Sequence, residues 1–94
     1  MYLRVITPSA SRSLKKLPKR IRELLVIATE ILEQNPYAGE KLTGPLYFLY
    51  SFHFKIGTTE YRVAYTINHE KGLVIVHLAH TRENFYEKVR RLFR

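Results

Sequence analysis

The spacing of apolar residues divides the first third of the chain into a strand and two helices. Residues 2–7 alternate between apolar and polar positions and end before Pro8, which predicts an opening β-strand. From Ser9 onward, apolar residues recur every three or four positions, as on the buried face of an α-helix. They are Leu14, Leu17, Ile21, Leu24, Leu25, Ala28, Ile31 and Leu32. Helices usually stop before a proline, and a proline fits the first turn of the next helix, so Pro18 predicts a helical hairpin.

The second half of the chain changes to the two-residue period of β-strands. Before it, the glycine- and proline-rich stretch NPYAGEKLTGPL predicts a connecting loop over 35–46. Strands are predicted at 51–56, 62–67 and 73–78, with turns at 57–60 and 68–72. Thr81 can cap a last helix that runs to about Leu92.

These elements predict a single α+β domain over residues 1–94. We expect an N-terminal strand, a helical hairpin, an antiparallel meander sheet of three to four strands with helices packed on one face, and a C-terminal helix. The opposite face of the sheet is expected to be open.

Composition supports a packed protein without cysteine chemistry. Hydrophobic residues make up 46% of the chain and aromatic residues 13%, well away from the composition of disordered chains. The absence of cysteine excludes disulfides, thiolate zinc sites and cysteine nucleophiles, so we expect no cofactor and no metal. No stretch has the length of a membrane span or the form of a signal peptide, and we expect a cytoplasmic protein.

The charge of the chain changes the expectation about its partners. Sixteen Lys and Arg residues against eight Asp and Glu residues give a formal net charge of +8. A small basic domain attracts polyanions, and nucleic acid is the first candidate because phosphate contacts release counterions. An acidic protein partner or plain solubility would use the same charge.

A group of basic residues is predicted to share one face of the sheet. Because side chains alternate across a strand, His53 and Lys55 point to the same side. If the turn at 57–60 pairs the two strands, Arg62 lies on that side too. Like charges on neighbouring strands repel, so a bound anion such as phosphate explains the cluster better than a structural role.

Three more candidates follow the last predicted strand. His80 and Arg82 stand at its end, where His80 can either reach the same face or make a structural hydrogen bond. Tyr86 can stack an unpaired base beside the cations or pack in the core. For the two other histidines, His77 lies in an apolar strand and favours a structural, partly buried role, while His69 lies in a turn and is expected to be solvated.

The helical hairpin also carries a basic stripe. Its members are Arg12, Lys15, Lys16, Lys19, Arg20 and Arg22. The stripe is either a solvated helix face or a grip on a nucleic-acid backbone. The carboxylates Glu60, Glu83 and Glu87 form no obvious pair, and the sequence contains no glycine-rich phosphate loop, serine triad or metal-ligand motif.

Nearly the whole chain resembles the RelE/ParE superfamily of small toxins from toxin–antitoxin operons. The resemblance rests on LKKLPKRIRELL in the hairpin, NPYAGEKLTG in the connector, EYRVAYTI in a strand and HLAHTRENFYEKV at the end. It implies the α+β fold described above. It also implies an antitoxin partner, similar to RelB, that neutralises the basic surface, in a heterotetramer or another hetero-oligomer.

The RelE branch of the superfamily is known for cleaving messenger RNA in the decoding site of the ribosome without metal. By position, the resemblance makes Lys55 a sheet lysine, Arg62 the strand arginine and Tyr86 the late tyrosine. His53 stands where the family has a second sheet lysine. The late basic residue falls on His80, with Arg82 as the nearby alternative.

The resemblance suggests a role for each residue in RNA cleavage by the 2′-hydroxyl. Lys55 and Arg62 would hold the phosphate, His80 would protonate the leaving oxygen, His53 or Lys55 would assist deprotonation, and Tyr86 would orient the nucleotide. Two alternatives remain open: a ParE-like inhibitor of DNA gyrase, and an inactive binding member of the superfamily.

Overall fold

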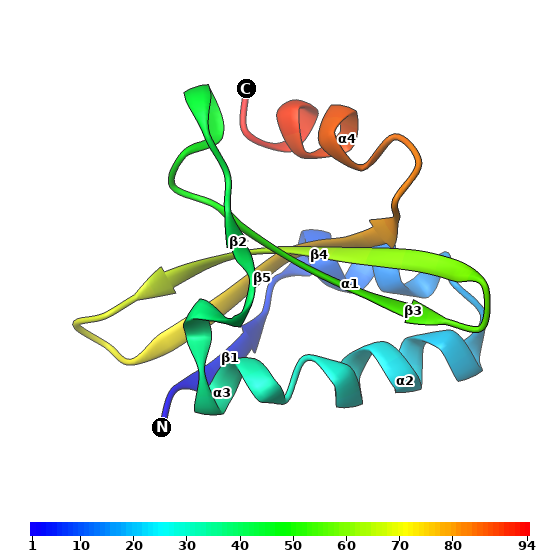
Figure 1. The fold of residues 1–94 in the computed structure, drawn as a ribbon, viewed down its shortest axis with the longest axis horizontal. Helices are drawn as coiled ribbons and strands as arrows, with labels where there is room; N and C mark the ends of the chain where they lie inside the picture. The colour runs from blue at the N-terminus through cyan, green and yellow to red at the C-terminus, as the bar shows by residue number, and fades with distance from the viewer.

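The computed structural model describes residues 1–94 and is built on one five-stranded sheet in the order β1-β5-β4-β3-β2. The strands are β1 (Leu3–Ile6), β2 (Glu40–Lys41), β3 (Tyr50–Ile56), β4 (Thr59–Asn68) and β5 (Leu73–Thr81). The helices are α1 (Pro8–Lys15), α2 (Lys19–Ala28), α3 (Ile31–Gln34) and α4 (Phe85–Leu92), with 3₁₀ turns η1 (Pro36–Ala38) and η2 (Gly44–Leu46). The predicted α+β class, with its opening strand, divided helices and final helix, is confirmed (Figure 1).

The edges of the sheet differ from the prediction. Strands β3 to β5 form the expected antiparallel meander, to which β2 adds a further antiparallel strand at one edge, while β1 pairs parallel to β5 at the other edge. Parallel strands need a long connection, and the segment from α1 to β4 separates β1 from β5 in the sequence. Strand β2 lies inside the predicted loop, because a strand of two residues, Glu40 and Lys41, is too short to produce alternation.

The helical hairpin divides at Pro18 as predicted, with α1 ending at Lys15 and α2 beginning at Lys19. The second helix does not run on unbroken. The carbonyl of Val26 accepts from the Arg4 guanidinium and from the Thr29 hydroxyl. The Glu30 N–H therefore bonds to the carbonyl of Ile27, 3.1 Å away, and the helix is interrupted before α3.

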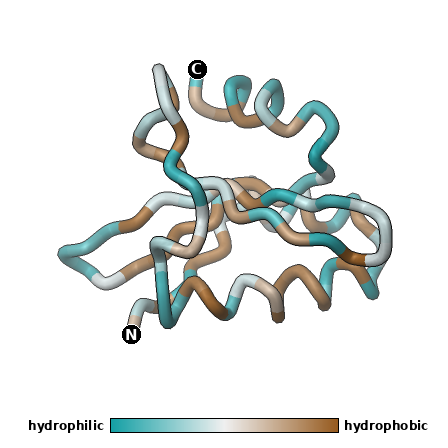
Figure 2. Tube along the Cα trace, in the orientation of Figure 1, coloured by the Kyte–Doolittle hydropathy of each residue, from teal (hydrophilic) through white to brown (hydrophobic).

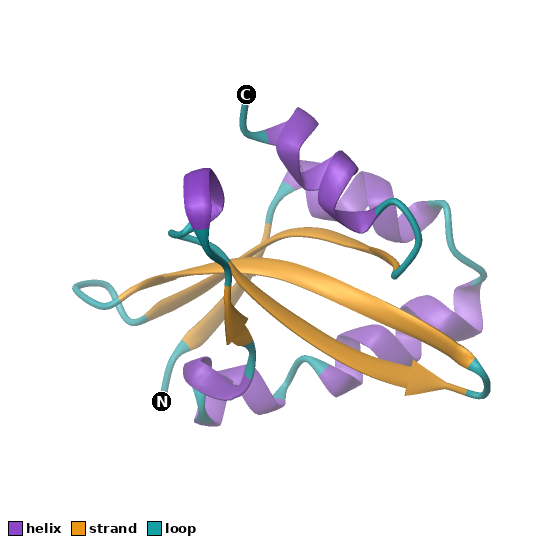
Figure 3. Cartoon of the chain, turned by 45° about the horizontal axis from the view of Figure 1, so that its top comes forward, coloured by secondary structure: helices purple, strands orange, loops and turns teal.

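Apolar residues form a separate cluster on each face of the sheet. The larger cluster lies under α1 to α3 and contains Ala10, Leu14, Leu25, Leu32, Tyr61, Val63, Tyr65, Val74, Val76 and Ala79. The smaller one contains Leu49, Ala64, Leu78, Phe85 and Val89. Helix α4 thus packs on the face opposite to α2 and α3, so the expected open face is only partly open (Figure 3). The turn between β4 and β5 is hydrophilic and forms one end of the molecule (Figure 2).

The start of α4 was predicted wrongly. Thr81 is the last residue of β5 and caps no helix. The backbone of Arg82 continues the pairing by donating to the carbonyl of Glu60 (3.0 Å), and α4 begins only at Phe85. The preceding residue, Asn84, has a left-handed backbone (φ 62°) and makes no side-chain cap. None of the helices has both the length and the apolar character needed to cross a membrane.

Tyr65 fixes the loop that leads into β2. Its hydroxyl donates to the carbonyl of Pro36 (2.6 Å) and accepts from the N–H of Gly39 (3.0 Å). Burial raises the pKa of this hydroxyl to about 12. A Cβ atom at Gly39 would lie 2.6 Å from the hydroxyl oxygen, so only glycine fits there. The contact fixes the position of the next residue, Glu40, which reaches into the site described below.

Candidate functional site

Arg62 lies at the centre of a polar group on the face of the sheet that α4 partly covers. Its neighbour on β3 is His53 and its neighbour on β5 is His80. The next pair along β3 and β4 joins Lys55 to Glu60. Residues opposite each other in a sheet project to the same face, so the predicted convergence of His53, Lys55 and Arg62 is present in the structure.

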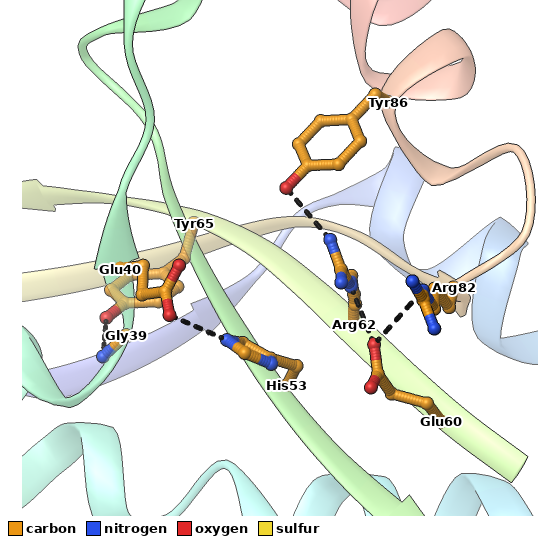
Figure 4. Close-up of polar contacts among 8 residues, drawn as sticks. All are labelled: Gly39, Glu40, His53, Glu60, Arg62, Tyr65, Arg82 and Tyr86. Atoms are coloured by element: carbon orange, nitrogen blue, oxygen red, sulfur yellow. Dashed lines mark hydrogen bonds and ion pairs between the residues drawn. The ribbon is translucent and has the colours of Figure 1, made fainter.

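Two partners fix the Arg62 guanidinium. Its Nε atom is 3.0 Å from an oxygen of Glu60, and its Nη1 atom donates to the Tyr86 hydroxyl over 2.8 Å (Figure 4). The guanidinium carbon also lies 5.4 Å from the centre of the Tyr86 ring. The Arg62 side chain is only 16% exposed, so these contacts hold it in one place, and its Nη2 atom has no protein partner.

Tyr86 therefore belongs to the site and not to the core. Its ring packs against Phe85 at 79°, but the residue is 42% exposed above the sheet. Since α4 begins at Phe85, Tyr86 lies in the first turn of the helix, where it can reach back to β4. The last helix thus supplies the predicted tyrosine, although the helix begins later in the sequence than predicted.

Glu60 is the residue that sequence reasoning missed. Besides Arg62, its carboxylate has the Nε atom of Arg82 at 3.9 Å. The hydrogen bond from Arg62 lowers the pKa of this carboxyl below its ordinary value, with smaller help from the charges of Arg62, Arg82 and His53. The signal was available, because Glu60 and Arg62 are two residues apart on one strand and so share a face.

A second carboxylate meets the cluster from β2. The Nε2 atom of His53 lies 3.4 Å from an oxygen of Glu40, so an imidazolium at His53 would be paired. Glu40 is 78% exposed, and such a pair is weak in water. Sequence reasoning could not find it, because it placed Glu40 in a loop.

Lys55 and Arg82 border an open groove of about 640 Å³ at one end of the cluster. The groove is lined entirely by polar or charged residues, namely Lys55, Thr58, Thr59, Glu60, Thr81, Arg82 and Glu83. Lys55 forms no ion pair, and the ion pair of Arg82 is the one with Glu60. Arg82 is 71% exposed and can move toward a ligand in this groove.

His80 has one ring nitrogen engaged and one free. Its Nδ1 atom lies 3.1 Å from the carbonyl oxygen and 3.2 Å from the hydroxyl of Thr81. The structural hydrogen bond is thus made with Thr81 at the strand end and not with a helix start. When Nδ1 donates to that carbonyl, Nε2 is the atom left to exchange a proton with a ligand.

The two remaining histidines are structural. His77 is the extra residue of a β-bulge opposite Ala64 and Tyr65, where its Nε2 atom contacts the Thr66 hydroxyl (2.8 Å) and burial lowers its pKa. His69 is not simply solvated as expected. It stacks on Tyr37 and contacts the hydroxyls of Tyr37 (3.0 Å) and Tyr2 (3.1 Å), which ties the β4–β5 turn to η1 and β1.

The basic stripe of the hairpin is not part of the Arg62 cluster. No hydrogen bond or ion pair joins Lys15, Lys19 or Arg20 to it, and Lys19 pairs with Glu23 at 4.0 Å on its own helix. Lys16 instead lines a cavity with His80. No three His, Asp or Glu side chains converge closely enough to ligate a metal ion.

A family model decides the identity of the chain. The model describes the ParE-like toxin of type II bacterial toxin-antitoxin systems, and it matches residues 5–90. This chain belongs to that family. A comparison of the toxin with curated protein sequences gave no match.

Solved structures place the toxin among RelE proteins and their complexes. It is 32% identical to a chain of the toxin–antitoxin complex RelBE2 from Mycobacterium tuberculosis, with a TM-score of 0.73 over 86% of the toxin and 98% of that chain. A mutant of E. coli toxin RelE in the free state is 22% identical, with a TM-score of 0.71 over 96% of each chain. The archaeal RelE-RelB complex from Pyrococcus horikoshii is 22% identical, with a TM-score of 0.60 over 87% of the toxin and 96% of that chain. At 22% identity the likeness concerns the fold alone.

Proposed function

We propose that this ParE-like toxin is an endoribonuclease that cuts messenger RNA on the ribosome, using side chains and no metal ion. The observation that carries the proposal is the convergence of His53, Arg62 and His80 on three neighbouring strands, with Tyr86 bound to the arginine. The 32% identity to a chain of the RelBE2 complex supports a relation to the RelE toxins.

The proposed reaction uses the RNA as its own nucleophile. The 2′-hydroxyl loses a proton to a base and its oxygen forms a bond to the adjacent phosphorus. The bond from phosphorus to the 5′-oxygen breaks, and that oxygen takes a proton from an acid. The products are a 2′,3′-cyclic phosphate and a 5′-hydroxyl, and the protein must stabilise the extra negative charge that forms on the phosphate.

Arg62 and Lys55 are suited to hold that phosphate. Glu60 and Tyr86 occupy Nε and Nη1 of Arg62, which leaves Nη2 to donate to a phosphate oxygen. Glu60 is a weak proton acceptor, because Arg62 lowers its pKa, so we assign it to holding the arginine and not to base catalysis. Lys55 lies opposite Glu60 on β3 and can add a second positive charge.

The two histidines are suited to the proton transfers. His80 is assigned as the acid for the 5′-oxygen, because its Nε2 atom has no protein partner. His53, once neutral, can accept the 2′-hydroxyl proton, with Lys55 as the alternative. Tyr86 offers an exposed ring edge to orient the nucleotide beside Arg62.

The test is to mix the protein with ribosomes stalled on end-labelled messenger RNA, beside the same RNA without ribosomes. We expect a cut in the decoding site that needs ribosomes, and a rate about 10²-fold to 10³-fold lower in Arg62→Ala. His80→Ala should lose at least about 10²-fold, the range for one acid–base group.

The matched control is Lys71→Ala, which removes one positive charge from the exposed turn far from the site. It should cut like wild type. If Arg62→Ala and His80→Ala cut within a factor of two of wild type, the proposed roles are wrong. If the protein cuts RNA only in the absence of ribosomes, the proposed dependence on the ribosome is wrong.

One observation favours a second candidate function. The matching family model is named for ParE-like toxins, and the resemblance to that branch implies inhibition of DNA gyrase. A supercoiling assay with added protein separates the two candidates. Inhibition of supercoiling without any RNA cleavage would replace the ribonuclease proposal.

A further inference from the structure

A cavity of about 320 Å³, separate from the groove beside Lys55, lies between α1, the end of β5 and α4. Its lining residues are Ser9, Arg12, Ser13, Lys16, Leu78, His80, Lys88, Arg91 and Leu92. Residues from both ends of the chain meet here, so neither helix alone could form the cavity.

The lining is strongly basic and contains no carboxylate. Of its cations, Arg12, Lys16 and Lys88 form no ion pair, while Arg91 pairs with Glu87 one turn earlier on α4. The three unpaired like charges around one concave surface repel each other when the cavity holds only water. A bound anion with several acceptor oxygens would relieve that repulsion and could accept hydrogen bonds from two helices at once.

The cavity shares His80 with the candidate site. This histidine is the β5 partner of Arg62 and is also part of the cavity wall. An extended strand whose phosphate lies at Arg62 and whose 5′-oxygen faces His80 would therefore carry its next phosphate toward α1 and α4. The lining includes no aromatic side chain other than the His80 ring, so it suits a phosphate better than a stacked base.

We infer that the cavity between α1 and α4 binds a backbone phosphate of the single-stranded RNA, next to the phosphate at Arg62. The inference rests on the proposed function for the choice of RNA as the ligand. An acidic peptide fits less well, because the cavity offers only two leucines, Leu78 and Leu92, for apolar anchoring. The inference also divides the basic stripe: Arg12 and Lys16 contact RNA, and Lys15 does not.

The experiment measures binding of a short RNA with 2′-O-methyl groups, which cannot be cleaved, so it does not depend on catalysis. The first variant is Lys16→Gln/Lys88→Gln, whose two side chains lie at the surface and at the cavity wall. Removal of one phosphate interaction should lower the slope of log affinity against log salt by about 0.7. At 0.1 M salt, that slope corresponds to about 5-fold weaker binding for each interaction removed.

Two control variants each remove one positive charge elsewhere, so their losses are compared with half of the loss in the double variant. Lys15→Gln lies one residue along α1 but outside the cavity, and Lys71→Gln lies in the distant turn. Both should leave the salt slope within experimental error of wild type. An equal loss for each charge removed in Lys15→Gln and in Lys16→Gln/Lys88→Gln would mean that the surface acts only through its general charge, and would overturn the inference.

A second probe locates the phosphate. RNA with one neutral methylphosphonate linkage is bound by wild type and by Lys16→Gln/Lys88→Gln. If the cavity holds that phosphate, wild type loses about 5-fold at one linkage and the variant loses less than about 2-fold there, since it no longer binds that phosphate. Equal losses at every linkage would overturn the inference. If RNA is bound in this way but never cut, the cavity site stands and the ribonuclease proposal fails.

Discussion

At the scale of single residues, Arg62 is held by partners of different chemistry before any ligand binds. The Glu60 carboxylate accepts a hydrogen bond from Nε, and the neutral Tyr86 hydroxyl accepts one from Nη1. A guanidinium fixed in this way needs little reorganisation when charge develops on a phosphate. Glu60 also reduces the net charge of the cluster, so a phosphate at Nη2 must compete with it for the arginine.

The Glu60 pKa gives a direct measure of this pair. Because Arg62 lowers the pKa below the ordinary value of 4.5, the ion pair stabilises the folded protein above that pH and loses its effect as the pH falls through the folded pKa. We expect a carboxyl ¹³C NMR titration to place Glu60 below 4.5 in wild type and closer to 4.5 in Arg62→Gln.

The control for this titration is Lys71→Gln, which keeps the Arg62 contact and should leave the Glu60 midpoint unchanged. The same Glu60 midpoint in wild type and Arg62→Gln would show that the carboxyl is not bound to the arginine in solution.

The two-residue period of the strands predicted the shared face of His53, Lys55 and Arg62. The same rule places Glu60 on the face of Arg62, so it would have predicted that this carboxylate belongs to the cluster. Glu40 is different, since its position depends on β2 and on the Tyr65 contacts with the preceding loop. Long-range contacts of this kind leave no periodic signal in the sequence.

At the scale of elements, α4 is attached by the smaller of the two apolar clusters. Phe85 and Val89, one turn apart and both fully buried, fix it to Leu78 and Ala64 on the sheet. The helix carries Tyr86 of the candidate site and Lys88 of the proposed cavity. An element held by few apolar contacts opens at a lower free energy than the core strands.

Shortening one of the buried side chains of α4 should therefore lower the free energy of opening of α4 more than that of the sheet. Val89→Ala removes about two methylene equivalents from a buried position, which costs about 2 kcal/mol. We expect faster amide hydrogen exchange over Phe85–Leu92, with little change in β4 and β5.

The control is Val63→Ala, the same substitution in the larger cluster, which should speed exchange across β3 to β5 as well. If each variant speeds amide hydrogen exchange equally in α4 and in the sheet, the two open together and the prediction is wrong.

Element boundaries were predicted less well than element types. The division at Pro18 follows from the chemistry of proline alone and was correct. The break before α3 depends on Arg4, which reaches the carbonyl of Val26 from another element. The late start of α4 depends on Arg82 extending the pairing with β4. Both boundaries are set by tertiary contacts that override local preference.

At the scale of the whole molecule, the charge of +8 is divided between surfaces. The Arg62 cluster and the cavity at His80 lie on either side of one strand end, where α1, α4 and the sheet meet. The net charge alone predicted a polyanionic partner, but it could not say which cations act together, because that depends on which helix covers which face.

Membership in a toxin family and the proposed chemistry lead to a test in cells. Expression of the wild-type protein alone should arrest growth, and co-expression of its antitoxin should restore growth, because an acidic antitoxin segment would cover the basic surface and block the RNA binding that we propose. Arg62→Ala should permit growth on its own and still co-purify with the antitoxin, since one side chain that is 16% exposed adds little to a large interface. Lys71→Ala should remain toxic. Normal growth during wild-type expression would contradict toxic activity. If Arg62→Ala arrests growth as strongly as wild type, the Arg62 cluster is not the cause of toxicity, and an inhibitory contact such as that proposed for gyrase would explain it better.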